Sequence, residues 1–318
     1  MPSRKIIIDT DPGVDDAMAI FFALRSPELD VIGLTTIFGN VETELATTNA
    51  LRLLEIAERI DIPVAHGAER PLVGPFKGSV PFVHGDDGQG NVHLPLPTNQ
   101  RIHTTAVQFI IDQIMAAPGE ITLVPIGPLT NIAQALRREP RIATHVKEVV
   151  LMGGNAFCPG NASPAAEANI LNDPEAADTV FGAPWPVTMV GLDVTHKVNM
   201  TPEHLARYSQ INNPMAQHIA RIVPFYRQYF ETDFSGMRGI YVHDSSAIAY
   251  LIDPTLFRVE RWPLRVETRG ISRGKTWPAV SNRETSAHFV PWHNRPLVNV
   301  CVEVDSARLT ALELSRMA

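Results

Sequence analysis

The stretch KIIIDTDPGVDDAMAIFFA, residues Lys5–Ala23, decides the fold. Its β-branched run Ile6–Ile8 is typical of a buried strand. The apolar spacing after Asp16, with Ile20 and Leu24 on one side, predicts one face of a helix. A strand therefore passes into a helix through the turn TDPGVDD, as expected at the start of an α/β protein.

Four carboxylates lie on this turn, those of Asp9, Asp11, Asp15 and Asp16. Aspartates are common in turns and at helix N-termini, where their oxygens cap free N–H groups, and this explains one or two of the four. Mutual repulsion would raise the pKa of some members of so dense a group, and a hard divalent cation would remove that penalty. We therefore expect a cation at this turn.

The composition is that of a large globular protein. The 318 residues are 45% hydrophobic and 19% charged, which suits one full-sized domain or two smaller ones, and we predict a single domain over residues 1–318. The net charge is −7, and the longest basic run is Arg137–Arg138. Because phosphate binding calls for basic patches, nucleic acid is not an expected partner.

Cysteine usage and hydropathy bear on the compartment. Cys158 and Cys301 lie far apart in sequence without CxxC spacing, which favours a reducing compartment and argues against a cysteine-built zinc site. No stretch approaches the ~20 continuous apolar residues of a membrane span, and the N-terminus lacks a signal-peptide pattern. We expect a cytoplasmic protein that does not bind membranes.

Strands and helices alternate along the rest of the chain, which implies parallel pairing through right-handed crossovers. Residues 69–98 form a long Gly-, Pro- and Asp-rich loop, and the chain from about Leu264 is β-rich. We predict a Rossmann-like α/β domain with a largely parallel (mixed) central sheet flanked by helices. Strands are expected at 31–38, 62–65, 121–126, 146–152, 187–194 and 297–304, helices at 42–60, 104–115, 131–138, 202–230 and 245–252, a helix N-cap at Asp173–Pro174, and irregular chain at 158–172.

Polar side chains follow several of these strands where each one ends. In parallel sheets, ligands bind outside the carboxyl ends of the strands, and loops far apart in sequence converge there. Asn40 follows the second strand, Ile126 and Met152 end two others, and His243–Asp244 opens a late helix. We therefore predict an active site at the carboxyl ends of the strands.

The chain resembles the nucleoside hydrolases, the inosine-uridine-preferring ribohydrolases. DTDPGVDD at 9–16 is similar to the signature of that family, and further segments match in the same order over about residues 5–254. These segments are FGN at 38–40, HG at 84–85, VPIGPLTN at 124–131, VLMGGN at 150–155, NASPAAEAN at 161–169 and VHD at 242–244. Single dipeptides are weak signals, but the ordered set is highly specific.

The resemblance implies hydrolysis of the N-glycosidic bond of ribonucleosides, in nucleoside salvage, with a tightly held Ca²⁺. It implies carboxylate ligands at Asp11, Asp16 and Asp244 and a backbone carbonyl ligand at Ile126, all oxygens as Ca²⁺ prefers. It also implies a set of substrate-binding residues. The ribose hydroxyls would be held by Asp15, Asn40, Asn161, Glu167 and Asn169. Met152 would lie beneath the ribose, and His84 and Tyr229 would lie near the base.

The implied mechanism rests on two catalytic residues. Asp11 would take a proton from a Ca²⁺-bound water that attacks the anomeric carbon, and nearby carboxylates would stabilise the oxocarbenium-like transition state. His243 would act as the general acid for the departing base, for which an ordinary imidazole pKa is suitable. Tyr226, Tyr229 and Phe230 would form a lid, although their helical spacing fits core residues equally well.

Two other functions compete with this interpretation. Asp9-Thr10-Asp11 after a strand is also found in aspartate-nucleophile phosphatases, and Gly85–Asp87 imitates their later acidic motif, but Pro12 does not fit their pattern. The second alternative is a protein that binds nucleosides or Ca²⁺ without catalysis. Ala168 replaces an aromatic residue that is common in the family. Purine or pyrimidine preference stays open, as does the choice between a homodimer and a homotetramer.

Overall fold

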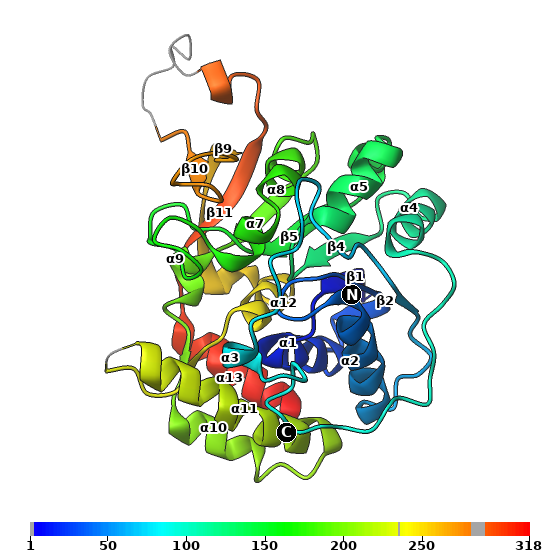
Figure 1. Cartoon of the computed structure of the whole chain (residues 1–318), viewed down its shortest axis with the longest axis vertical. Coiled ribbons are helices and arrows are strands. Elements are labelled where there is room, and N and C mark those ends of the chain that lie inside the picture. The colour runs from blue at the N-terminus through cyan, green and yellow to red at the C-terminus, as the bar shows by residue number, and fades with distance from the viewer. Residues whose placement is uncertain (1–2, 235, 281–289) are drawn as a thin grey trace.

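The computed structural model describes residues 3–234, 236–280 and 290–318, and a nine-stranded sheet runs through it (Figure 1). The strand order is β10-β9-β11-β6-β5-β4-β1-β2-β3. Seven neighbouring strands, from β11 to β3, pair in parallel, and β9 and β10 add an antiparallel edge. The predicted largely parallel, mixed sheet is confirmed. The strands are β1 (Arg4–Thr10), β2 (Leu29–Thr36), β3 (Val64–Ala65), β4 (Thr122–Pro125), β5 (Glu148–Met152), β6 (Val187–Val190), β9 (Phe257–Val266), β10 (Thr276–Pro278) and β11 (Leu297–Val304); β7 (Asn199–Met200) and β8 (Ile240–Tyr241) form a separate pair.

Helices cover both faces of the sheet because β1 is apolar on both sides. Ile6 and Ile8 face one hydrophobic core, with α1, α2 and α10–α13, whereas Ile7 faces a second core, with α4, α5, α6 and α8. The helices are α1 (Val14–Leu24), α2 (Thr43–Ile56), α3 (Pro81–His84), α4 (Ala106–Ala116), α5 (Thr130–Arg138), α6 (Ile142–His145), α7 (Ala168–Asn172), α8 (Pro174–Phe181), α9 (Leu192–Thr195), α10 (Pro202–Tyr208), α11 (Pro214–Asp233), α12 (Asp244–Ile252) and α13 (Ser306–Met317), with 3₁₀ turns η1 (Pro254–Leu256) and η3 (Val290–Trp292). No helix in the described ranges is long and apolar enough to cross a membrane.

The chain order reverses between β1 and β4, which lie side by side at the centre of the sheet. Strands β2 and β3 continue to one side of β1, and β4, β5 and β6 continue to the other. At such a switch point the two connections leave in opposite directions and open a crevice at the carboxyl ends. Asp11 follows β1 and Ile126 follows β4, so the acidic turn lies at this crevice.

The structure differs from the predicted elements in several places. The stretch 158–172, expected to be irregular, ends in the short helix α7, which Glu167 caps, and the expected loop 69–98 contains the short helix α3. The strand expected to continue to residue 194 ends at Val190, because Gly191 turns the chain into α9. The helical section 202–230 is two helices, since Asn213 caps a new helix that starts at Pro214. The β-rich end includes β9–β11 but closes with α13, which the prediction missed; residues 281–289 of that section lie outside the described residues.

The C-terminal helix α13 places a carboxyl group in the core. Glu313 is fully buried, Oε1 accepts a hydrogen bond from the Tyr208 hydroxyl at 3.2 Å, and Oε2 has no partner among the described residues. Burial raises the pKa of Glu313 to about 7. Because this folded-state pKa lies above the ordinary value of 4.5, the contribution of Glu313 to stability is lost as the pH rises from about 4.5 through 7.

Glu313→Gln should therefore raise the free energy of unfolding at pH 8 by about 3 kcal/mol more than it does at pH 5. The amide keeps an acceptor for Tyr208 and never ionises. Thermal unfolding at both pH values would measure this, with Glu58→Gln on the exposed surface as the matched control. An equal shift at both pH values would show that Glu313 does not titrate in this range.

Candidate active site

A cavity of about 250 Å³ opens at the carboxyl ends of the central strands. The residues predicted for the site converge there, although they come from segments far apart in sequence. The wall includes Asp15, Asn40, His84, Ile126, Met152, Asn161, Glu167, Asn169, Tyr229, His243 and Asp244, whereas Asp11 and Asp16 are fully buried and are not part of the wall.

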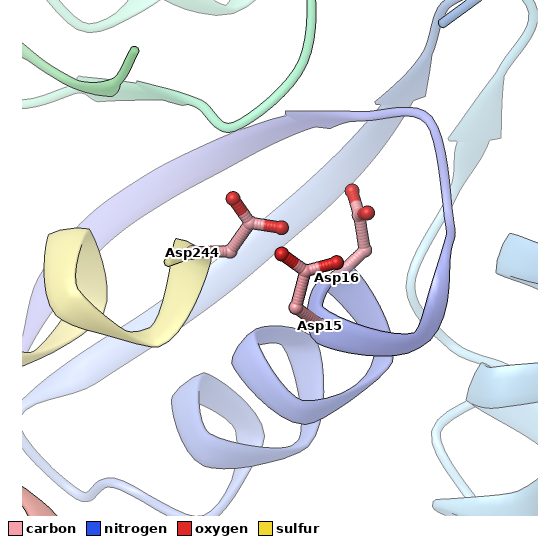
Figure 2. A group of neighbouring side chains, drawn as sticks. All are labelled: Asp15, Asp16 and Asp244. Carbon is pink, nitrogen blue, oxygen red and sulfur yellow. The ribbon is translucent and has the colours of Figure 1, made fainter. Parts of the chain in front are cut away.

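Three carboxylates meet at one side of the cavity (Figure 2). Asp15 and Asp16 come from the first turn of α1, and Asp244 is the first residue of α12; an oxygen of each lies within 4.8 Å of the others. Asp16 is held rigidly, because Oδ2 accepts hydrogen bonds from the Gly13 N–H at 3.0 Å and from Asn40 Nδ2 at 2.9 Å. Asp15, which the sequence assigned to the ribose, thus lies in the cluster that could hold a metal ion.

Asp11 is linked to this cluster by its backbone N–H, which donates to Asp16 Oδ1 at 3.3 Å, and its side chain lies in a space that only glycine neighbours allow. A methyl group on either Gly39 or Gly127 would collide with the Asp11 carboxylate. Asp11 Oδ2 accepts a hydrogen bond from the Asn40 N–H at 2.6 Å, and Oδ1 is buried without a partner among the described residues. Asp9 Oδ2 is likewise buried without a partner among the described residues, so it is the nearby carboxylates of the cluster that make a cation the fitting partner for Asp11.

Burial raises the pKa of every member of this acidic group, and the charges of neighbouring carboxylates raise the pKa of Asp11, Asp15 and Asp244 further. Burial contributes most for Asp15, whose pKa rises to about 7, and the charge of Asp16 adds to it. Burial, followed by the neighbouring carboxylates, also raises the pKa of Asp11 and Asp244 well above the usual range. A divalent cation would remove this penalty, and a set made only of oxygens suits Ca²⁺ or another hard cation.

Asp9, the fourth aspartate of the turn, has a structural role. Its Oδ1 accepts hydrogen bonds from the Thr35 hydroxyl and from Asn131 Nδ2, and the side chain is not part of the cavity wall. Asn131 also donates to the Thr36 carbonyl at 3.0 Å. The VPIGPLTN motif therefore ties the ends of β1 and β2 together, and the dense aspartate pattern contains one residue that the cavity does not use.

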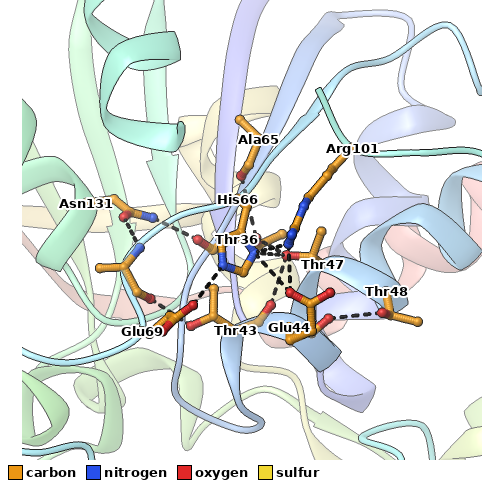
Figure 3. Close-up of polar contacts among 11 residues, drawn as sticks. Thr36, Thr43, Glu44, Thr47, Thr48, Ala65, His66, Glu69, Arg101 and Asn131 are labelled. Carbon is orange, nitrogen blue, oxygen red and sulfur yellow. Dashed lines mark hydrogen bonds and ion pairs between the residues drawn. The ribbon is translucent and has the colours of Figure 1, made fainter. Parts of the chain in front are cut away.

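A second polar cluster lies at the loop that follows β3 (Figure 3). Thr47 Oγ1 lies 2.7 Å from His66 Nδ1, and Arg101 donates to the same ring nitrogen at 2.9 Å and to Glu44 at 2.7 Å. Glu69 lies 3.4 Å from His66 Nε2. These groups satisfy one another and are separate from the cavity, so we interpret them as an anchor for the long loop.

The residues predicted to bind ribose are also held by the backbone. The Glu167 carboxylate caps α7 and accepts hydrogen bonds from the N–H groups of Gly154, Asn169 and Ile170 at 2.9–3.1 Å. Asn169 Nδ2 donates to the Ile126 carbonyl at 2.9 Å, and the exposed Asn161 accepts the Ala168 N–H at 3.0 Å. The edge of the cavity predicted to bind the sugar is therefore held by hydrogen bonds within the protein.

Both predicted histidines lie in the cavity wall and are neutral at pH 7. His84 Nδ1 accepts the Val14 N–H at 3.2 Å, its ring stacks on Tyr226 at 5.3 Å, and burial lowers its pKa to about 3. His243 Nδ1 lies 2.8 Å from the Thr195 hydroxyl, and burial lowers its pKa to about 3 as well. The ordinary pKa expected for His243 is therefore wrong.

Aromatic side chains of α11 line part of the cavity, and Tyr226 reaches the acidic cluster, where burial and the neighbouring carboxylate of Asp15 raise its pKa. Tyr226 and Phe230 of α11 are buried in the core and also line the cavity, whereas Tyr229 is half-buried and lies 6.0 Å from the exposed ring of Phe82 on α3. Tyr226 and Phe230 therefore fit the core interpretation while lining the cavity, and a lid formed with Tyr229 stays a prediction. The sequence motifs did not assign Val80, Phe82, Val83 and His196; the first three lie within four residues of the matched segment at 84–85, and His196 lies near no matched segment.

The acidic motif that imitates a phosphatase belongs to the loop. Asp87 accepts hydrogen bonds from the backbone N–H groups of Gln89, Asn91 and His93 at 2.7–2.8 Å, and it is not part of the cavity wall. Its role is to fold the glycine-rich loop after α3.

Comparisons with known proteins agree over nearly the whole chain. The family model described as inosine-uridine preferring nucleoside hydrolase matches residues 6–311. The chain is 44% identical over 315 residues to probable uridine nucleosidase 2 of Arabidopsis thaliana, covering 99% of this chain and 97% of that protein. It is 46% identical to the inosine-uridine preferring nucleoside hydrolase of Leishmania major, covering 84% of each. The solved structure of the plant nucleoside hydrolase PpNRh1 superposes with a TM-score of 0.94 at 42% identity, covering 99% of both chains.

Proposed function

Since the chain belongs to the inosine-uridine preferring nucleoside hydrolase family, and so hydrolyses the N-glycosidic bond of ribonucleosides, we propose that the reaction takes place in the cavity beside the acidic cluster. The observation that carries the proposal is the approach of Asp15, Asp16 and Asp244 to within 4.8 Å at the cavity. The loop role of Asp87 leaves the phosphatase interpretation without support.

The acidic group would hold a divalent cation, for which Ca²⁺ is our proposal. Asp11, Asp16, Asp244 and the Ile126 carbonyl are the proposed ligands, and Asp15 lies close enough to share in binding either the cation or the ribose. The Oδ1 atoms of Asp11 and Asp15, which have no hydrogen-bond partner in the part of the chain that the structure describes, support a cation at this position. When bound, the cation would supply a water of lowered pKa and a Lewis acid for the sugar hydroxyls.

Asp11 is the proposed general base. It lies at the switch point, it is fully buried, and its Oδ1 has no donor within residues 3–234, 236–280 and 290–318. A carboxylate in this state can accept the proton of the attacking water while the opposite face of the sugar loses the base. Asn40, Asn161, Glu167, Asn169 and Met152 are the proposed contacts of the ribose.

His243 is the proposed group that helps the base to leave, with His84 and Tyr229 near the base. A neutral imidazole donates one N–H hydrogen bond and need not be an imidazolium to stabilise the negative charge that develops on the base. The lowered pKa of His243 supports donation by the neutral ring over full proton transfer from a charged one. The alanine variants of His243 and His84 test which of the two histidines activates the leaving base.

Product analysis tests the proposed function. The protein would be incubated with inosine, uridine, cytidine and adenosine in the presence of Ca²⁺, and the products would be separated by chromatography. Free base and ribose are expected, and the relative rates would assign purine or pyrimidine preference. No product from any of the four nucleosides would refute the proposal.

Removal of the cation should abolish turnover and lower the melting temperature. A cation present at about 1,000 times its dissociation constant adds about 4 kcal/mol to the free energy of unfolding, because it binds only the folded protein. Thermal unfolding of chelator-treated protein with and without Ca²⁺ would measure this, with Mg²⁺ as the comparison ion. In Asp16→Asn the shift should be lost. Full activity after exhaustive chelation would contradict a metal-dependent reaction.

Other expectations remain proposals. A homodimer or homotetramer, a cytoplasmic location and a place in nucleoside salvage are expected from the family resemblance. Sedimentation equilibrium would test the first of these directly.

A further inference from the structure

Thr195 makes the hydrogen bond that orients His243. Thr195 is the last residue of α9 and is fully buried, and its Oγ1 lies 2.8 Å from His243 Nδ1. Its backbone N–H donates to the Gly191 carbonyl at 3.1 Å, and Gly191 packs so closely on Gly154 that a methyl group there would collide. The hydroxyl is therefore fixed to the carboxyl ends of β5 and β6.

The remaining neighbours of the His243 ring do not fix its orientation. His196, Tyr241 and Phe230 surround it with ring centroids at 5.6, 5.9 and 6.2 Å. Its Nε2 makes no hydrogen bond to any residue that the structure describes, and His243 lines the cavity. Because aromatic contacts tolerate rotation of the ring, the Thr195 hydroxyl is the contact that distinguishes one ring nitrogen from the other.

We propose that Thr195 is a positioning residue, whose hydroxyl donates to His243 Nδ1 and so keeps the hydrogen of the neutral ring on Nε2, directed at the departing nucleobase. This rests on the proposed role of His243 in the reaction. As the C1′–N bond breaks, its electron pair passes to the base nitrogen, and the Nε2–H hydrogen bond stabilises that charge. The attacking water forms the new bond to C1′ and gives its proton to Asp11, and the base gains its own proton through solvent. Thr195 itself transfers no proton in this step.

Two substitutions separate this role from simple packing. Thr195→Val keeps the shape and removes the hydroxyl, whereas Thr195→Ser keeps the hydroxyl. Thr195→Val should lower kcat on inosine about ten- to a hundredfold and change kcat on nitrophenyl riboside less than about threefold, because an activated leaving group needs no help. Thr195→Ser should restore most of the rate on inosine. Thr310→Val, a buried threonine on α13, is the matched control.

Equal losses of Thr195→Val on the two substrates, or a Ser variant as slow as the Val variant, would overturn the proposal. If Thr195→Val does not fold, ¹⁵N NMR of the wild-type imidazoles still decides, since it distinguishes the expected Nε2–H form of His243 from the Nδ1–H form that would overturn it. Absence of any nucleoside hydrolysis by the wild type would refute the proposed function instead, and the NMR result would be unaffected.

Discussion

Asp11→Asn should lower turnover of inosine by about 10³-fold or more and at the same time raise the melting temperature of the metal-free protein. Activity should fall while stability rises, because the Asp11 carboxylate is both a proton acceptor and a buried charge. Its free oxygen is the proposed proton acceptor, and an amide cannot accept that proton. Its negative charge is buried beside Asp16 and Asp15, which raises its pKa, so removal of the charge relieves repulsion when no cation is present.

Asp9→Asn is the matched control for this result. Asp9 is equally buried two residues earlier, and burial raises its pKa to about 7, but its donors Thr35 and Asn131 can bond equally well to an amide oxygen. We expect stabilisation in this variant without a loss of turnover. Steady-state kinetics and thermal unfolding would be measured on both variants.

The role of Asp11 as a base must also be separated from its role as a ligand. Calorimetric titration with Ca²⁺ gives the dissociation constant of Asp11→Asn, and kinetics are then measured at a Ca²⁺ concentration far above it. Turnover that returns to the wild-type level under these conditions would identify Asp11 as a ligand only. An unchanged rate at ordinary Ca²⁺ would exclude it from catalysis.

Local pattern predicted the fold and the residues of the cavity wall that end strands, whereas the resemblance to the family supplied His84, Asn161, Glu167, Asn169 and Tyr229. The alternation of β-branched strands with amphipathic helices dictates a parallel sheet, and the turn after β1 must then lie at its carboxyl edge. Chain reversal between β1 and β4 brings the Asp9–Asp16 turn to Ile126. Motif residues that end strands were therefore placed correctly.

The sequence could not predict which residues share a role. Asp9 has the same side chain as Asp11, but Thr35 and Asn131 donate hydrogen bonds to its Oδ1. These partners are brought to Asp9 by tertiary contacts. Glu167 carries an N-cap role that the motif did not reveal. His196 enters the wall through packing of the chain at the end of α9, for which no periodicity gives a signal.

His243→Ala should slow hydrolysis of inosine by about 10²–10⁴-fold and leave hydrolysis of nitrophenyl riboside within a few-fold of wild type. Hypoxanthine is a poor leaving group, and its departure depends on a donor at the cavity wall. Nitrophenolate departs without one, so the same variant should retain the metal and ribose contacts that this substrate also needs. The ratio of the two kcat values in wild type and variant measures the contribution.

His84→Ala provides the contrast that makes this result specific. His84 accepts the Val14 N–H at the start of α1 and stacks on Tyr226, so its loss should disturb the turn that carries Asp15 and Asp16. That disturbance acts on the metal and the ribose, and both substrates should slow alike. Equal losses for His243→Ala on the two substrates would mean that His243 also acts through the acidic cluster, because Asp244 is its neighbour in sequence. Selective loss on inosine in His84→Ala would instead make His84 the group that activates the leaving base.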